Sequence, residues 1–160
     1  MNTSIKDGFI YGLLATLAMT VIMLLSVATK ISPMPAPIPV ALVKTLLGAM
    51  PKPALMALGM IAHFIYGGIA GSIFAWLFSN RTLGVGFLWG AILWLIMQVV
   101  FLPILGWGIF GSNITPKIAV ATLILHLIYG GTIGWLFARN AGTVSSEGTG
   151  ASINSERMNL

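Results

Sequence analysis

Long apolar segments without any charged residue alternate with shorter polar or proline-containing segments along the 160-residue chain. A helix needs about 20 mostly apolar residues to cross the ~30 Å hydrocarbon core of a bilayer. Each of the apolar segments reaches that length, and the first exceeds the ~7–15 residues of a signal-peptide core. The expected spanning helices are residues 8–29, 54–80, 83–105 and 118–138.

The connections between these spans differ in character. Residues 82–116 form an uncharged run too long for one span, and Pro103 with the glycines after it predicts the end of the third helix, leaving 106–116 as an apolar loop. Proline at alternate positions in residues 33–39 blocks helix formation and favours an extended path. Residues 40–50 return to helical spacing but are too short to span, which favours an interfacial or re-entrant helix.

The C-terminal segment has a different composition from the rest of the chain. Residues 140–160 are rich in Gly, Ser, Thr and Asn and contain few large apolar side chains. Such a composition does not bury enough surface to offset the entropy of ordering. We therefore expect a membrane domain at residues 1–139 followed by a flexible polar tail.

Composition supports this assignment to the membrane and narrows the chemistry. Hydrophobic residues make up 58% of the chain and charged residues only 7%, against about 25% charged residues in soluble domains. Cysteine is absent, which excludes disulfides and thiolate sites. The acidic residues Asp7, Glu147 and Glu156 all lie outside the apolar runs, so no buried carboxylate is available for acid–base catalysis. We expect no enzyme.

The basic residues indicate lipid rather than nucleic acid as the partner. The net charge is +5, but the eight Lys and Arg are scattered between the apolar runs and form no cluster. They are expected to contact lipid headgroups. Four fall on each side of the expected spans, so the positive-inside rule gives no orientation; we expect a multi-pass protein of the cell membrane with cytoplasmic termini.

Two segments of the chain occur twice. HFIYGG, beginning at His63, returns 63 residues later as HLIYGG at His126, and these are the only two histidines. GFIYG, beginning at Gly8, returns as GFLWG at Gly86. The expected fold class is therefore an all-α integral membrane four-helix bundle built from two tandem two-helix repeats, residues 8–80 and 83–139.

The repeats also predict a polar layer. Each repeat has two spans, so both enter the membrane from the same side and are related by a pseudo-two-fold axis along the membrane normal, not by inversion. At ~1.5 Å per residue, His63 and His126 lie ~12–14 Å inside the loop-side boundary. Thr20 and Gln98 come ~18 Å from the opposite boundary of a ~30 Å core, at about the same level. The histidines are expected to face each other across the axis.

The first functional hypothesis treats these residues as packing residues. Small residues spaced by four lie on the same face as each histidine, as at Gly59, Gly67 and Gly71 around His63. Such stripes let helices approach closely in lipid, and each histidine would then hydrogen-bond a neighbour. Without a catalytic constellation, this favours a non-catalytic accessory or scaffold subunit that packs against other membrane subunits or a second copy.

Two alternatives remain open from the sequence. One is electron transfer by a single haem b with His63 and His126 as axial ligands, since helix bundles commonly hold such cofactors. The other is a pore or carrier for a small neutral solute. A bare metal ion is not expected, because two imidazoles fall short of a closed zinc shell, and the spacing of Met34, Met50, Met56 and Met60 matches no copper motif. The residues expected around the histidines are Gly67, Gly130, Tyr66, Tyr129, Thr20 and Gln98.

The chain also carries a resemblance to a known group of proteins. The first span contains GLLATLAMT from Gly12, and a proline-rich linker and the motif His63-x-x-x-Gly67 follow it. This order resembles an uncharacterised family of small four-helix membrane proteins from bacteria and archaea, over about residues 8–139. The resemblance implies the four-span topology and no particular activity.

Overall fold

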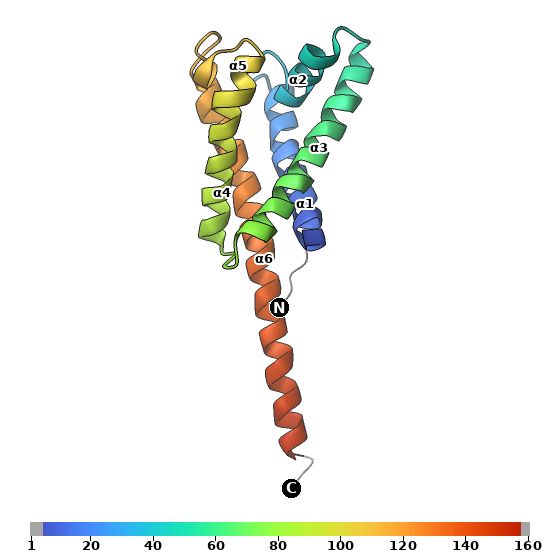
Figure 1. Ribbon diagram of the computed structural model, residues 1–160, viewed down its shortest axis with the longest axis vertical. Coiled ribbons are helices and arrows are strands. Elements are labelled where there is room, and N and C mark those ends of the chain that lie inside the picture. The colour runs from blue at the N-terminus through green and yellow to red at the C-terminus, as the bar shows by residue number, and fades with distance from the viewer. Residues whose placement is uncertain (1–4, 158–160) are drawn as a thin grey trace.

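The computed structural model describes the backbone of residues 5–157 and the side chains of residues 5–140 (Figure 1). Within this part the chain is helical and contains no strand. The elements in chain order are α1 (Ile5–Ala28), α2 (Ile38–Leu47), α3 (Lys52–Leu77), α4 (Leu83–Ile96), the π-helix η1 (Met97–Phe101), α5 (Leu102–Ile104), the 3₁₀-helix η2 (Ile109–Gly111) and α6 (Lys117–Arg157).

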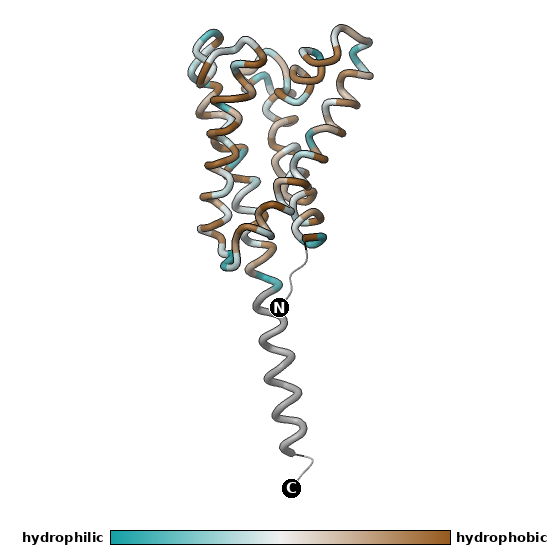
Figure 2. The backbone as a smooth tube through the Cα atoms, in the orientation of Figure 1, coloured by the Kyte–Doolittle hydropathy of each residue, from teal (hydrophilic) through white to brown (hydrophobic). Residues whose placement is uncertain are grey.

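Four stretches of helix are long and apolar enough to cross a membrane: Ile5–Ala28, Lys52–Leu77, Leu83–Ile104 and Lys117–Asn140. They coincide with the four predicted spans, and the third joins α4, η1 and α5. Hydrophobic residues follow these helices along most of their length, while hydrophilic ones gather near their ends (Figure 2). The chain is thus consistent with a multi-pass membrane protein, as the sequence predicted.

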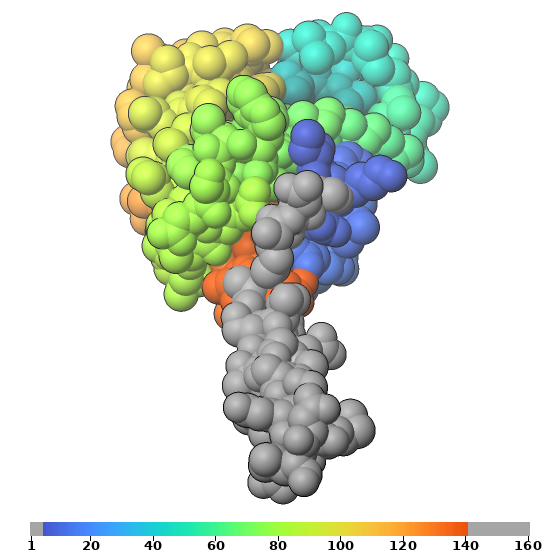
Figure 3. All heavy atoms as spheres, turned by 60° about the horizontal axis from the view of Figure 1, so that its bottom comes forward, coloured from blue at the N-terminus to red at the C-terminus, as the bar shows by residue number. Residues whose placement is uncertain are grey.

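The four long helices run alternately up and down. α1 and α4 begin at the end of the bundle where the N-terminus lies, and α3 and α6 return to it (Figure 1). α1 packs against α3, α4 packs against α6, and α6 also contacts α1. Seen from the end where these helices return, α6 up to residue 140 emerges between α4 and α1 (Figure 3). The α1–α6 contact therefore joins two antiparallel hairpins.

The proline-rich connection leads into a short helix at the opposite end, as predicted. α2 begins directly after Pro37 and α3 directly after Pro51. Proline suits these positions because the first N–H groups of a helix have no intrahelical partner. Gly48 ends α2 with φ at 85°, a conformation that favours glycine. Val40 of α2 lies against the backbone of Gly59, so α2 is held close to α3.

The third spanning helix contains a π-helical turn that the sequence did not predict. In it, the Leu102 N–H bonds to the Met97 carbonyl, one residue further back than in an α-helix. Pro103 follows immediately, and proline lacks the N–H that would bond to the carbonyl of Val99 and would crowd that carbonyl in a regular helix. The wider turn accommodates the proline without ending the helix, which continues to Ile104.

The C-terminal part of α6 covers most of the segment for which a flexible polar tail is expected. The backbone is helical through Arg157 and projects beyond the bundle (Figure 1). Each added residue extends an existing helix at little cost compared with nucleating a new one, so a packed helix can continue into a polar segment. The side chains beyond residue 140 lie outside the described part, and the flexibility of this segment stays a prediction.

Glycines bring α1 and α3 into direct backbone contact. A Cβ atom on Gly12 would lie 3.0 Å from the Cα of Gly71, and one on Gly71 would lie 2.7 Å from the Cα of Gly12. Gly67 lies against the side chain of Thr16. Dispersion forces act only at such short range, and lipid supplies no hydrophobic drive between helices, so close approach is the main source of attraction.

The second hairpin packs in the same way. A Cβ on Gly86 would lie 2.8 Å from the Cα of Gly134, and one on Gly130 would lie 3.0 Å from the Cα of Gly90. Gly90 also lies against the backbone carbonyl of His126. The two helices that contain the histidines are therefore held by glycines of a neighbouring spanning helix: α3 by those of α1, and α6 by those of α4.

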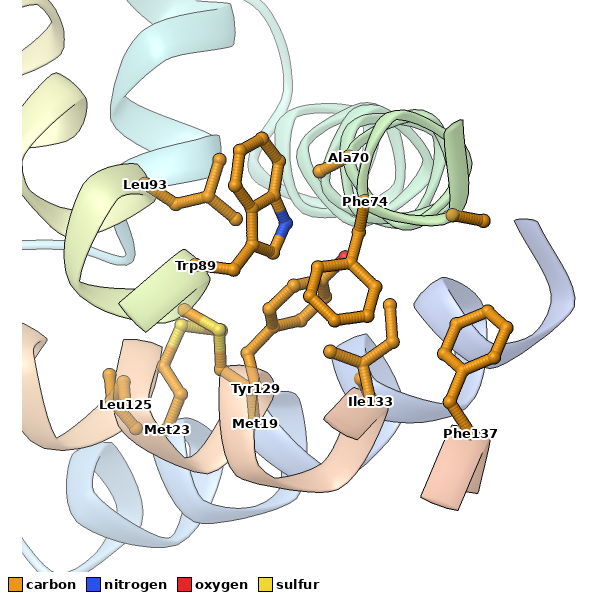
Figure 4. Close-up of a cluster of buried hydrophobic side chains, with 12 residues drawn as sticks. Met19, Met23, Ala70, Phe74, Trp89, Leu93, Leu125, Tyr129, Ile133 and Phe137 are labelled. Atoms are coloured by element: carbon orange, nitrogen blue, oxygen red, sulfur yellow. The ribbon is translucent and has the colours of Figure 1, made fainter. Parts of the chain in front are cut away.

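Larger side chains fill the space between the hairpins. Phe74 of α3 packs against Trp89 of α4, with ring centroids 6.3 Å apart, and against Phe137 of α6 at 5.7 Å. Met19 and Met23 of α1 point into the same cluster (Figure 4). This apolar cluster draws residues from all four spanning helices and so joins the two hairpins.

Substituting Gly130 tests the glycine packing. Gly130→Ala should lower the free energy of unfolding by ~1–3 kcal/mol, the usual cost of overpacking, because its methyl group would meet the backbone of α4. SDS titration of the detergent-solubilised protein, followed by circular dichroism, measures this change.

Gly84→Ala is the matched control. Its nearest neighbour would be the Thr82 hydroxyl at 4.0 Å, so the substitution should be neutral or stabilise by up to ~1 kcal/mol through helix propensity. Equal losses in both variants would contradict the packing role of Gly130.

Candidate functional site

A cavity of about 130 Å³ lies between the spanning helices, on the side of the bundle that α2 covers. The surrounding residues recur at spacings of three or four on each helix, which places them on one face. Each long helix contributes to the lining, and so do the linker and α2. The described lining residues are Thr16, Met19, Met23, Met34, Ile38, Pro39, Leu42, Ala62, His63, Tyr66, Gly67, Leu93, Met97, Phe101, Thr122, Leu125, His126 and Tyr129.

Both histidines line this cavity. His63 comes from α3 and His126 from α6, so residues 63 positions apart share one site. None of the described lining residues is acidic. The imidazoles thus meet without a carboxylate between them, in surroundings that are otherwise mostly apolar.

His126 is oriented by its own helix. Its Nδ1 lies 2.8 Å from the carbonyl oxygen of Thr122, which can only accept a hydrogen bond, so Nδ1–H is the donor. In a neutral imidazole the second nitrogen then carries no hydrogen. His126 Nε2 therefore presents a lone pair rather than an N–H group, and the ring is only 8% exposed.

His63 is less constrained. Its Nε2 atom is buried and has no hydrogen-bond partner among the described residues. A buried polar atom without a partner costs free energy, of order 1–3 kcal/mol. Native proteins rarely leave such an atom unpaired unless a ligand, ion or water completes it.

The two tyrosines of the repeated segment have different roles. The Tyr129 hydroxyl donates to the Gly67 carbonyl at 2.7 Å, a bond that joins α6 to α3. Tyr66 packs edge-on against Phe101, with ring centroids 5.9 Å apart, and its hydroxyl makes no hydrogen bond among the described residues. Tyr129 is thus a structural link between the hairpins, while Tyr66 keeps an available hydroxyl at the site.

Three residues predicted around the histidines do not line the cavity. Gln98 is fully buried, and its side-chain amide donates to the Thr122 hydroxyl at 2.9 Å, so it lies one helical turn from His126. Thr20 is buried, but its hydroxyl has no partner among the described residues. Gly130 packs against Gly86 instead.

Four methionines line the cavity, and of these the sequence pattern had drawn attention only to Met34. Met19 and Met23 come from α1, Met34 from the linker and Met97 from the π-helical turn. Methionine is common filler in apolar helices, so composition alone gave no signal. Met19 and Met97 hold equivalent places after the similar segments that begin at Gly8 and Gly86, which was the one available hint.

Fold and site together define a class: an all-helical chain with four helices able to cross a membrane and a histidine-containing cavity between them. Within that class, the chain belongs to a family of unknown function, DUF6789, whose family model matches residues 2–147. This confirms the resemblance to an uncharacterised family. No curated protein and no solved structure matches the chain.

The two tyrosines offer a paired test. Tyr129→Phe removes the hydrogen bond to Gly67 and should lower the free energy of unfolding by ~0.5–1.5 kcal/mol. Tyr66→Phe, at the corresponding position, should leave it unchanged within error. SDS titration measures both, and a larger loss for Tyr66→Phe would reverse the assignment of roles.

A double-mutant cycle tests the bond between Gln98 and Thr122. Thr122→Val keeps the shape of the side chain but leaves the buried Gln98 amide without its hydrogen-bond partner. Gln98→Leu removes the amide, so that no partner is needed at residue 122. Thr122→Val should therefore cost more in the wild-type background than in Gln98→Leu, by ~0.6–1.7 kcal/mol. Strictly additive losses, measured by the same titration, would mean that the bond contributes nothing.

Proposed function

We propose that the protein is a small membrane-embedded binding protein that holds its ligand in the cavity around His63 and His126. The buried, unpartnered Nε2 atom of His63 is the observation that carries this proposal, since a ligand in the cavity would complete it. His126 Nε2 supplies a second acceptor, and the Tyr66 hydroxyl supplies a donor. A small number of polar groups that converge on a mostly apolar pocket is typical of ligand sites.

The proposal includes the tandem repeat and its pseudo-two-fold axis. The segments that begin at Gly8 and Gly86 align with an offset of 78 residues, and those at His63 and His126 with an offset of 63. Residues that correspond under these offsets line the cavity in pairs. The pairs are Met19 with Met97, Met23 with Phe101, Ala62 with Leu125, His63 with His126 and Tyr66 with Tyr129. The equivalent glycine contacts in the two hairpins give further support, and the cavity would then lie on the axis.

The volume of the cavity favours a ligand smaller than haem. An engineered cavity of roughly 150 Å³ is known to take one benzene ring, and this cavity is about 130 Å³. A porphyrin has four pyrrole rings and must fit between the two axial imidazoles. Haem binding would therefore require the helices to separate, so a small molecule or an ion suits the site better.

The other hypotheses remain compatible with a binding protein. An accessory subunit would present the bound ligand to a larger membrane assembly, and a carrier would release it across the bilayer. Only the binding role has an observation of its own in the cavity. We also retain the prediction that both termini are cytoplasmic. The alternation of four spanning helices supports both termini lying on the same side of the membrane.

Native mass spectrometry of protein purified from its own membranes in mild detergent tests the binding role. The wild-type chain should carry one additional mass per chain, and Ala62→Phe should lose it because the added ring fills the cavity. Ile61→Phe is the control, since Ile61 is 55% exposed on the outer face of α3. A bare mass for wild type in every preparation, or equal ligand retention in Ala62→Phe, would overturn the proposal.

A further inference from the structure

The donor atoms around the cavity are unusual for a site between membrane helices. Met19, Met23, Met34 and Met97, whose side chains carry thioether sulphurs, line the cavity together with His63 and His126, whose side chains carry imidazole nitrogens. The methionines belong to three separate parts of the chain: α1, the linker and η1. All of these donors are uncharged when the imidazoles are neutral, and none of the described lining residues is acidic.

Thioether sulphur is a soft, polarizable donor. Soft ligands select Cu(I), whereas carboxylate and carbonyl oxygens select Mg²⁺, Ca²⁺ and Mn²⁺, and imidazole suits copper as well as zinc. A structural zinc site is a closed tetrahedral shell of Cys, His or carboxylate ligands, which this cavity does not offer. The mixture of methionine and histidine therefore favours copper in its reduced state.

The lack of charged donors in the cavity also favours Cu(I). Burying an isolated ion in an apolar medium is costly, and in the Born description this cost rises with the square of the charge. Neutral donors do not offset the charge of a dication. A monovalent ion such as Cu(I) therefore carries a much smaller penalty than a dication would.

The imidazoles are arranged as metal ligands commonly are. A metal-bound histidine usually donates its other N–H to a carbonyl or carboxylate, which fixes the ring and its tautomer. His126 does this with the Thr122 carbonyl at 2.8 Å, and Nε2 keeps its lone pair. Thr122 is in turn held by Gln98, whose amide donates to its hydroxyl. His63 adds a buried Nε2 that has no partner among the described residues.

The π-helical turn places one donor at the cavity. Met97 begins η1 and Phe101 ends it, and both line the site. π-turns inside α-helices occur frequently at functional sites, because they shift side chains relative to the regular helix. The turn also directs Gln98 into its buried position beside Thr122.

We propose that the cavity binds one Cu(I) ion through methionine thioethers and histidine imidazoles. Met19 and Met97, which correspond in the two repeats, and His126, whose ring is already oriented, are the central ligands. Met34 lies in the linker, so the segment that leads into α2 also contributes a residue to the site. This inference rests on the proposed binding role and names the class of ligand.

Competition with the colorimetric Cu(I) chelator bicinchoninate tests the site. The full chain in detergent is titrated under anaerobic, reducing conditions, and wild type should remove one equivalent of Cu(I) from the chelator. The double variant Met19→Leu/Met97→Leu conserves side-chain volume. It should weaken binding by at least about tenfold, since even substitution of residues that only hydrogen-bond to metal ligands lowers metal affinity 10–100-fold.

Met56→Leu is the matched control, because Met56 lies on α3 and does not line the cavity. It should bind Cu(I) like wild type. His126→Ala gives a second, independent variant, and circular dichroism establishes that each variant is folded. Unchanged affinity in the folded double variant and in folded His126→Ala would overturn the copper site, as would a wild-type chain that removes no Cu(I) from the chelator.

The two proposals fail in different ways. If native mass spectrometry finds an organic molecule that Ala62→Phe abolishes while Cu(I) does not bind, the binding role stands and the copper assignment is wrong. If neither a bound mass nor Cu(I) binding is found, both are wrong. Zn²⁺ should not displace Cu(I) at equal concentration, and displacement would contradict the soft-donor argument.

Discussion

Direct backbone contact between glycines is the interaction on which the rest of this structure depends. In a bilayer the lipid tails are as apolar as leucine, so helices associate through dispersion forces, and these need close approach. Gly12 and Gly71 provide that approach in the first hairpin, and Gly86 and Gly134 provide it in the second. A side chain at any of these positions would separate the helices and the residues that they carry.

The same contacts decide where the cavity lies. α1 and α3 touch near the end where the termini lie and diverge toward the other end, where α2 lies against α3 (Figure 1). Helices that are tight at one end and apart at the other leave a space that side chains must fill. The methionines and histidines line that space without filling it, and the linker also contributes to its lining. Packing at one end of the bundle thus leaves a cavity toward the other.

Several features of the fold followed from local patterns. The four spans were predicted because a run of about 20 uncharged apolar residues has few alternatives in a bilayer. The short helix after the prolines followed from the fixed backbone angle of proline and the return of helical spacing. The π-turn at Met97 was not predicted, because its form depends on how the helix accommodates Pro103 and packs around Gln98. The helical continuation of α6 to Arg157 was not predicted either, since composition measures burial and not helix extension.

The candidate site shows the same division. The sequence by itself determined that His63 and His126 stand at matching places in two similar segments, and that no carboxylate accompanies them in the apolar runs. Only the tertiary structure decided that Met19, Met34 and Met97 line the same cavity as the histidines, and that Thr20 does not. The physical reason is that periodicity defines the face of one helix, whereas the identity of the facing residues depends on how neighbouring helices cross, and here the glycine contacts between the helices set that crossing.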